Sequence, residues 1–346
     1  MDMSLPAFSY GSDDSGLVWG FLIREGGGSV PINAADAIVR MRTARAAQEP
    51  ARAPGEFVWL HFNLSNAASE RWLRAHAGLG ENFFEVLHQG SRSTRIEVDD
   101  DALVAVVNDV LHNFSFDSAD ISTLWVHVTP YGAISARRKP LESIERLRHA
   151  VERGDALRSP VELLVHLLRD QADVLVNIVR DAVTRVDTTE DQLLAGRLTR
   201  KREDLGALRR VLVRLQRLLA PEPAALFRLL QRPPSWISAD DRQDLRQATE
   251  EFTVVLTDLA SVQERIKLLQ EEIAAQVNED NNRSLFLLTI VTVMALPINL
   301  IAGLLGMNVG GLPLAQNTQG FWIVLGFIAA FTGGVAWLLL RLQRPR

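Results

Sequence analysis

The residues best suited to chemistry are three asparagines in the apolar C-terminal part of the chain, Asn282, Asn299 and Asn308. Each amide offers a neutral carbonyl acceptor and an N–H donor. Such carbonyls can accept hydrogen bonds from the water shell of a divalent cation without stripping that shell. A polar amide facing lipid at mid-membrane is costly, so Asn299 is expected to face a pore or another subunit. Asn308 could alternatively serve only as a C-terminal helix cap.

The segment that must position these amides carries no charge. From residue 284 to residue 340, 57 consecutive positions hold no Asp, Glu, Lys, Arg or His. Roughly 20 helical residues cross a bilayer core of about 30 Å. We therefore predict transmembrane helix 1 at residues 284–305, an outer loop at 306–320 and transmembrane helix 2 at 321–340. A buried helical hairpin in a soluble core is disfavoured, because such helices usually show one polar face.

Arginines flank this segment and predict its orientation. Arg283 precedes the first span, and Arg341, Arg344 and Arg346 follow the second, whereas the loop between the spans has no basic residue. The positive-inside rule then places both termini in the cytoplasm, with residues 341–346 as a basic tail. No basic region followed by an apolar one opens the chain, so no signal peptide is expected. The sequence predicts a multi-pass protein of a bacterial-type inner (plasma) membrane, with the lipid bilayer as a partner.

The rest of the chain is acidic and lacks catalytic patterns. Residues 1–282 hold 33 basic and 42 acidic residues, and the absence of cysteine excludes disulfides, thiolate metal sites and a cysteine nucleophile. No GxxxxGK[ST], HExxH or GxSxG motif is present. None of the seven histidines pairs with an acid at a metal-ligand spacing, and His61 and His127 fit core or surface positions better. We predict no enzyme activity, no catalytic residue, no cofactor and no nucleic-acid partner.

Residues 1–234 predict a cytoplasmic α/β domain with a helical hairpin. Residues 172–230 are dense in apolar and charged side chains and predict an antiparallel helical pair, with a weak break at Ala195-Gly196 and an end at Pro221 and Pro223. Residues 125–139 predict a strand, a turn and a second strand. Runs rich in β-branched and aromatic residues predict the other strands, with helices between them: strands at 17–23, 57–64, 103–110 and 124–128, and helices at 67–77 and 81–87.

A single long helix is expected from the N-cap Ser238 to Leu305. No glycine lies between Gly206 and Gly303, and Pro297 is the one proline inside the predicted helix. At 1.5 Å per residue the helix would be roughly 100 Å long, which no small domain can bury from end to end. We therefore predict a stalk, with residues 235–283 as its cytoplasmic part, that enters the membrane and packs against copies of itself.

One face of this predicted helix follows alternating steps of three and four residues. Its members are small or polar in the membrane half and partly acidic in the cytoplasmic half. Such a stripe is typical of a tightly packed seam or of a water-lined path. We call it the 3.5-residue stripe; it comprises Glu250, Val254, Thr257, Ser261, Glu264, Leu268, Glu271, Ala275, Asn278, Asn282, Leu285, Thr289, Thr292, Leu296, Asn299, Gly303 and Gly306.

The first apolar run ends in Gly306-Met307-Asn308, and here the sequence resembles the CorA superfamily of divalent-cation transporters. The signature of that superfamily is Gly-Met-Asn at the outer end of the first of two spans. Magnesium transporters of the superfamily more often have an acidic loop after the motif, which this chain lacks. The similarity runs from about Phe57 to the C-terminus, and four further segments look like the ZntB-like zinc-transporter branch: residues 91–98, 125–139, 234–242 and 309–313.

The resemblance implies a CorA-like funnel-shaped homopentamer, with five stalk helices around a central pore and five second spans outside them. It implies Zn²⁺ as the transported cation, with Ni²⁺, Co²⁺, Cd²⁺ or Mg²⁺ as further candidates, and transport linked to protons. Alternatives are a CorA-type Mg²⁺, Co²⁺ or Ni²⁺ channel, zinc efflux, and a membrane-anchored scaffold or sensor without transport. Carried over by position, Gly306, Met307 and Asn308 would form the pore mouth, with Asn308 contacting the metal through its hydration shell. The implied pore-lining residues are Asn282, Leu285, Leu288, Thr289, Leu296, Asn299 and Gly303.

The uncharged tail limits how such a pore could work. Leu285 and Leu288 predict an apolar constriction near the cytoplasmic side, which could gate by excluding water. Neither span nor the loop contains a titratable side chain, so proton coupling would have to use water, the cytoplasmic funnel or an indirect effect of the gradient. A negative-inside potential favours cation entry by about 2.3 kcal/mol per charge at 100 mV, so uptake is predicted over efflux.

Overall fold

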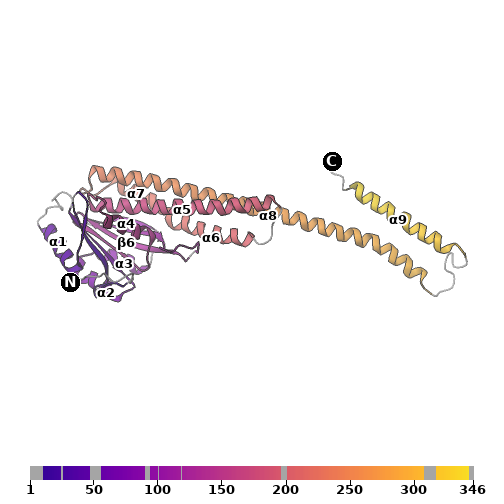
Figure 1. Ribbon diagram of the computed structural model, residues 1–346, viewed down its shortest axis with the longest axis horizontal. Helices are drawn as coiled ribbons and strands as arrows, with labels where there is room; N and C mark the ends of the chain where they lie inside the picture. The colour runs from indigo at the N-terminus through magenta and orange to yellow at the C-terminus, as the bar shows by residue number, and fades with distance from the viewer. Residues whose placement is uncertain are drawn as a thin grey trace. The chain divides into compact units, whose positions relative to one another are not determined.

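The computed structural model describes residues 11–24, 26–46, 56–89, 94–99, 101–117, 119–195, 201–307 and 317–342 (Figure 1). The chain divides into two compact units, with the boundary between Leu269 and Gln270. The first unit holds a sheet with helices, and the second holds two helical segments that are largely apolar beyond Arg283. Each unit is described by itself below.

The first unit is built on seven strands, which are β1 (Leu17–Ile23), β2 (Ser29–Pro31), β3 (Phe57–Asn63), β4 (Arg95–Asp99), β5 (Ala102–Val110), β6 (Ile121–Thr129) and β7 (Gly132–Arg137). Their order in the sheet is β2-β1-β3-β7-β6-β5-β4. The β3–β7 pair is parallel, and the other neighbours are antiparallel. The predicted α/β domain is thus confirmed, its sheet is mixed, and the predicted strand–turn–strand segment at residues 125–139 forms the β6–β7 hairpin.

Helices cover both faces of this sheet, because its strands alternate apolar residues between two cores. In β3, Leu60 and Phe62 enter one core, and Phe57 and Trp59 enter the other. The first core is closed by α1 (Ala34–Ala46), α2 (Ala67–Trp72), the π-helical turn η1 (Leu73–Ala77) and α3 (Glu81–Gln89). The second core is closed by α4 (Glu142–Arg153), α5 (Pro160–Leu194), α7 (Pro221–Gln231) and the start of α8 (Ala239–Leu305).

The expected helical pair needs correction. The first helix, α5, begins at Pro160 rather than at residue 172, and its cap is the Ser159 side chain, which accepts from the Glu162 N–H. The second helix, α6 (Lys201–Leu219), does end before Pro221, but the chain then enters a third helix, α7, with Pro221 in its first turn. Proline fits this position because the first N–H groups of a helix have no partner inside the helix. Pro221 therefore begins α7, in addition to marking the end of α6.

The predicted long helix is confirmed as α8, which spans 67 residues. Its start is capped as expected: Ser238 Oγ accepts a hydrogen bond from the Asp241 N–H at 3.0 Å and donates one to Asp241 Oδ2 at 2.7 Å. Pro297 lies inside the helix and removes one backbone hydrogen bond without ending it.

The second unit holds the end of α8 and the apolar helix α9 (Gly320–Leu342). Among the described residues, length and composition qualify one helix, α8, to cross a membrane; its most apolar window has a mean hydropathy of 2.4 and is entirely unburied. A second apolar stretch, Gly320–Val335, is shorter. An unburied apolar helix argues against the alternative of a helical hairpin inside a soluble core.

Candidate functional site

The part of α8 that precedes the predicted first span presents two opposite faces. One face repeats every seven residues and is buried: Leu245, Phe252, Leu259, Ile266 and Ile273. A second buried row lies three residues after each of the first four of these, at Ala248, Val255, Val262 and Leu269. Together these rows form the a and d positions of a heptad seam. The seam packs inside the subunit, so it does not need a second copy of the chain.

Polar contacts join this part of α8 to α5, which lies beside it (Figure 1). Arg158, two residues before α5 begins, donates to Asp244 at 2.6 Å at one end of the helix pair. Further along, Arg265 pairs with Asp187 at 2.7 Å and also with Glu190. Surface ion pairs of this kind contribute little to stability individually, but they set the register of the two helices. The rotation of α8 about its axis is therefore determined by its own domain.

The 3.5-residue stripe occupies the face opposite the seam. In the heptad frame its members stand at the c and f positions, and all of those between Glu250 and Asn278 are exposed in the single subunit. Two of them are large and apolar: Val254 is 61% exposed and Leu268 is 57% exposed. Because packing against α5 and the sheet fixes the seam inward, the stripe must face solvent, a pore or another subunit.

The stripe continues along the same helix into the second unit. Its members Asn282, Thr289 and Asn299 are exposed there, as is Gly303. The Thr289 hydroxyl donates to the Leu285 carbonyl at 2.8 Å, which leaves the lone pairs of the hydroxyl oxygen to accept from water. The predicted pore-lining residues thus share one helix and are spread along it.

Large apolar side chains accompany the polar ones on this stretch. Leu285 and Leu288 are 61% and 64% exposed, and Leu296 is exposed to a similar degree. Leu285 and Leu296 belong to the stripe, whereas Leu288 lies one turn from Leu285 and slightly to its side. In water these positions would be unfavourable, so the helix needs lipid, a partner or a narrow pore around it.

The residues predicted to form a pore mouth follow directly after α8. The Gly306 N–H donates to the Ala302 carbonyl at 2.9 Å, and both Gly306 and Met307 are exposed. A Cβ atom at Gly306 would lie 2.9 Å from that same carbonyl oxygen, which is too close for a side chain. Glycine therefore allows the backbone to stay this near the last turn of the helix. Asn308 lies outside the described residues, and its assignment stays a prediction.

His61, in the first unit, has a structural role. His61 is fully buried, its Nδ1 lies 2.8 Å from Ser135 Oγ, and its ring stacks on Trp19 with 4.1 Å between centroids. Burial, reinforced by the charges of Arg137 and Arg148, lowers the pKa of His61 well below its usual value, so the ring stays neutral. Within the part of the chain that the structure describes, no three acidic or histidine side chains gather into a metal-binding group.

Sequence patterns missed a buried carboxyl group that caps α4. Asp109, at the end of β5, accepts hydrogen bonds from the Ser143 N–H at 3.0 Å and the Ser143 hydroxyl at 2.9 Å. Burial raises the pKa of Asp109 to about 6 despite these bonds. Glu222 is fully buried too, and burial together with the Asp109 charge raises its pKa well above the usual value. An alternating apolar pattern cannot reveal this pair, because the two residues are far apart in the sequence.

Comparison with known proteins decides the family. A family model described as a CorA-like Mg²⁺ transporter protein matches residues 54–341, which include the sheet, the long helix and the apolar tail. The chain belongs to this CorA-like family. CorA-like proteins are transporters of divalent cations rather than enzymes, and the expected CorA resemblance is confirmed.

Relatives cover the chain almost from end to end. CmaX, a divalent cation transporter of Pseudomonas aeruginosa, is 30% identical over 340 residues, which are 96% of this chain and 97% of that protein. ZntB, a zinc transport protein of Pectobacterium carotovorum, is 25% identical over 283 residues, which are 82% of this chain and 86% of that protein. The ZntB-like branch inferred from sequence is therefore among the CorA-like relatives.

Solved structures agree with the arrangement of elements described above. The structure of full-length CmaX matches with a TM-score of 0.77 and 27% identity, covering 95% of this chain and 99% of that one. The CorA magnesium transporter from Methanocaldococcus jannaschii matches with a TM-score of 0.73, covering 93% and 97% of the two chains. At 19% identity the second likeness shows the fold alone.

Proposed function

We propose that this CorA-like chain forms a homopentameric pore for divalent cations, lined by the 3.5-residue stripe of α8, and that Zn²⁺ is the cation it takes up. The observation that carries the proposal is the orientation of α8. Its heptad seam is occupied within the subunit, which leaves the stripe as the face available to line a pore. Five copies of that face around an axis would enclose a polar path flanked by apolar rings.

The membrane arrangement follows from the apolar helices. Residues 284–305 of α8 form the first span, and residues 321–340 in α9 form the second, with the connecting residues 306–320 on the outer side. Residues 1–283 and 341–346 lie in the cytoplasm of a bacterial-type inner membrane. The basic residues beside both spans and their absence from the connection support this orientation.

Selection would take place on a hydrated cation. Five Asn308 carbonyls at the outer mouth accept hydrogen bonds from the water shell, and Asn299 repeats the same chemistry deeper in the pore. Small divalent cations give up their water reluctantly, so neutral carbonyls that leave the shell in place suit them. Met307 packs as a flexible apolar side chain beside this ring. Gly306 lets the backbone stay close to the last turn of α8 as the chain leaves that helix.

The same face would concentrate cations on the cytoplasmic side. Glu250, Glu264 and Glu271 are exposed members of the stripe, so a pentamer would stack three acidic rings along its axis. Glu264 accepts from Lys267 at 3.1 Å, but an exposed pair of this type is weak and leaves most of the negative field in place. Charged rings of this sign raise the local cation concentration.

Zinc is the most specific part of the proposal. ZntB proteins are among the relatives, and residues 309–313 lack the acidic side chains common after the motif in magnesium transporters. CmaX is described more broadly as a divalent cation transporter. A membrane potential of 100 mV would favour entry of a divalent ion by roughly 5 kcal/mol, which supports uptake.

Liposome flux tests the proposal. Purified protein is reconstituted and loaded in parallel with Zn²⁺, Mg²⁺, Ni²⁺ and Co²⁺, for the wild type and Asn308→Ala. Gln319→Ala serves as the matched control, because it removes a neutral amide from the same connection. We expect Zn²⁺ to move fastest, Asn308→Ala to lose selectivity, and the control to match the wild type.

Two results would count against it separately. Unchanged selectivity in Asn308→Ala would refute the asparagine ring, and Zn²⁺ flux no faster than Mg²⁺ flux would refute the zinc preference. Native mass spectrometry of the detergent-solubilised protein gives the number of subunits independently, and any number other than five would refute the pentamer.

A further inference from the structure

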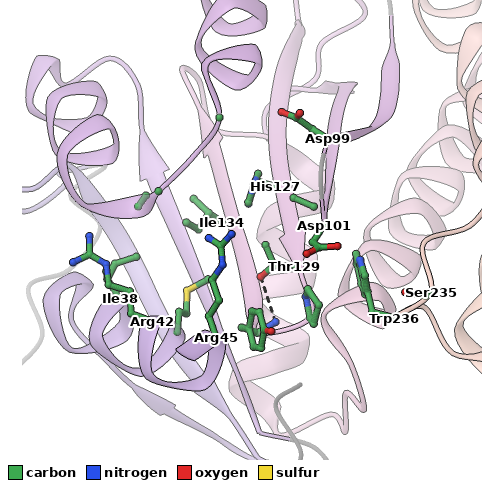
Figure 2. Close-up of a pocket in the computed structure, with 17 residues that line it drawn as sticks. Ile38, Arg42, Arg45, Asp99, Asp101, His127, Thr129, Ile134, Ser235 and Trp236 are labelled. Carbon is green, nitrogen blue, oxygen red and sulfur yellow. Dashed lines mark hydrogen bonds between the residues drawn. The ribbon is translucent and has the colours of Figure 1, made fainter. Parts of the chain in front are cut away.

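A cavity of about 440 Å³ opens at the hairpin end of the sheet in the first unit (Figure 2). One face of α1 and the β4–β5 and β6–β7 turns line it. Trp236, in the connection between α7 and α8, closes one side. The volume lies in the range of small-molecule sites, which are commonly about 300–1,000 Å³. Neither the pore nor the apolar tail involves this cavity.

The walls are held by backbone contacts as well as by side chains. The Thr129 hydroxyl donates to the Gly132 carbonyl at 3.1 Å and accepts from the Tyr131 N–H at 3.3 Å, which fixes the β6–β7 turn. A Cβ atom at Gly132 would lie 2.6 Å from the Val58 carbonyl oxygen and 3.2 Å from the Met41 side chain, so glycine lets this turn pack closely on β3 and α1. The cavity is therefore preformed in the folded domain.

Two arginines of α1, Arg42 and Arg45, line the cavity, and Figure 2 shows Arg45 reaching toward its middle. Arg42 donates to the His76 carbonyl at 2.6 Å, which anchors its guanidinium to η1 and leaves other N–H groups free. Arg45, one turn further on, forms no hydrogen bond or ion pair with any residue that the structure describes. A guanidinium is suited to phosphate because it can donate two parallel hydrogen bonds.

Carboxylates stand on the other side of the cavity from these arginines. Asp99 and Asp101 flank the β4–β5 turn, and neither forms an ion pair within the described ranges. Figure 2 shows Asp101 beside Trp236, with Arg45 across the cavity from both. Opposite charges that face each other without pairing leave room for a ligand with an anionic end and a hydrogen-bond-donating end.

A buried histidine forms the floor between the two charged sides. His127 is 8% exposed, and its Nδ1 has no hydrogen-bond partner among the described residues. Burial and the nearby charge of Arg45 lower the pKa of His127 to about 4, so the ring is neutral in the cytoplasm. A neutral imidazole offers one donor and one acceptor to a bound molecule without adding charge.

We propose that this cavity binds an adenine mononucleotide. The phosphate contacts Arg42 and Arg45, the exocyclic amino group of the base donates to Asp101, and the base lies against Trp236. Aromatic side chains bind bases through their flat faces, and a carboxylate accepts hydrogen bonds from an amino group but repels a carbonyl oxygen. This proposal is independent of the transported cation and of the number of subunits.

The test is isothermal titration calorimetry on the full-length protein in detergent. AMP, IMP and inorganic phosphate are titrated separately in the presence of EDTA, which removes divalent cations. We expect one AMP per subunit and at least tenfold weaker binding of IMP, which carries a carbonyl in place of the amino group. Arg45→Gln should weaken AMP binding about 10- to 100-fold, as expected for the loss of charge-assisted hydrogen bonds.

Two further variants separate specific from general effects. Asp101→Asn should abolish the preference for AMP over IMP. Arg40→Gln removes the same charge from an exposed position of α1 that does not line the cavity, and it should bind AMP like the wild type. The comparison of AMP with IMP needs no variant, so it holds even if a substitution disturbs folding. The proposal is overturned if AMP fails to saturate the wild type, if phosphate binds as tightly as AMP, or if both arginine variants weaken binding equally.

Discussion

Stability of the first unit should depend on the ionisation of Asp109, and the sign of the effect is unusual for a carboxyl group. Burial raises the pKa of Asp109 from 3.8 to about 6. The folded state therefore holds a proton that the unfolded state has already released, and stability falls as the pH rises from about 4 through 6. The full effect of this shift is about 3 kcal/mol, because one pKa unit corresponds to about 1.36 kcal/mol.

The assay compares thermal unfolding of the wild type and Asp109→Asn, followed by tryptophan fluorescence in detergent between pH 4.5 and 7.5. Roughly 2 kcal/mol of the effect falls in this window, because the unfolded carboxyl is already mostly ionised at pH 4.5. The difference in stability between the two proteins should change by that amount, or roughly 4–8 °C in melting temperature. The loss of the contacts to Ser143 in the variant is nearly independent of pH, so it shifts the whole curve without changing its slope.

A matched control is Asp14→Asn, which changes an exposed carboxyl in the same unit. The melting temperature of this control, plotted against pH, should run parallel to that of the wild type. Glu222 acts in the same direction as Asp109, because the Asp109 charge raises its pKa further, so the variant should lose some of that contribution as well. Parallel curves for the wild type and Asp109→Asn would show that Asp109 is ionised normally and would refute the reasoning.

Three further predictions concern α8 and Gly306, the residue that follows it. Leu285→Ser combined with Leu288→Ser should raise cation flux in liposomes, because hydroxyls let water enter an apolar constriction; flux equal to that of the parent protein would exclude such a gate. Phe252→Ala, in the buried seam, should lower stability by about 3–5 kcal/mol. Val254→Ala, on the opposite face, should change stability by less than about 0.5 kcal/mol, and equal losses in thermal unfolding would contradict the assignment of the two faces. Gly306→Ala would place a Cβ atom 2.9 Å from a carbonyl oxygen of the preceding turn, so transport should fall at an unchanged melting temperature; normal transport would show that this close approach of the backbone is dispensable.

Local patterns determined much of this protein before its tertiary structure was considered. The uncharged segment, the unbroken run without glycine and the cap at Ser238 predicted α8, and its bounds, Ala239–Leu305, agree. Strand β1 also matched its apolar run, because alternating side chains and β-branching act over a few residues. The motif Gly306-Met307-Asn308 indicated the family by its position after that helix. These features depend on neighbours in the sequence, so sequence alone can show them.

Tertiary structure decided which groups share a site and which way α8 faces. Its spacing of three and four residues marked a stripe, but only packing of Phe252 and its heptad partners against the domain showed that the stripe points away from the subunit's core. Likewise, Asp109 and Glu222 meet through burial, and Arg45 and Asp101 line one cavity although 56 positions separate them. Such contacts join residues far apart in the chain, and they exist only once the sheet and its helices have folded together.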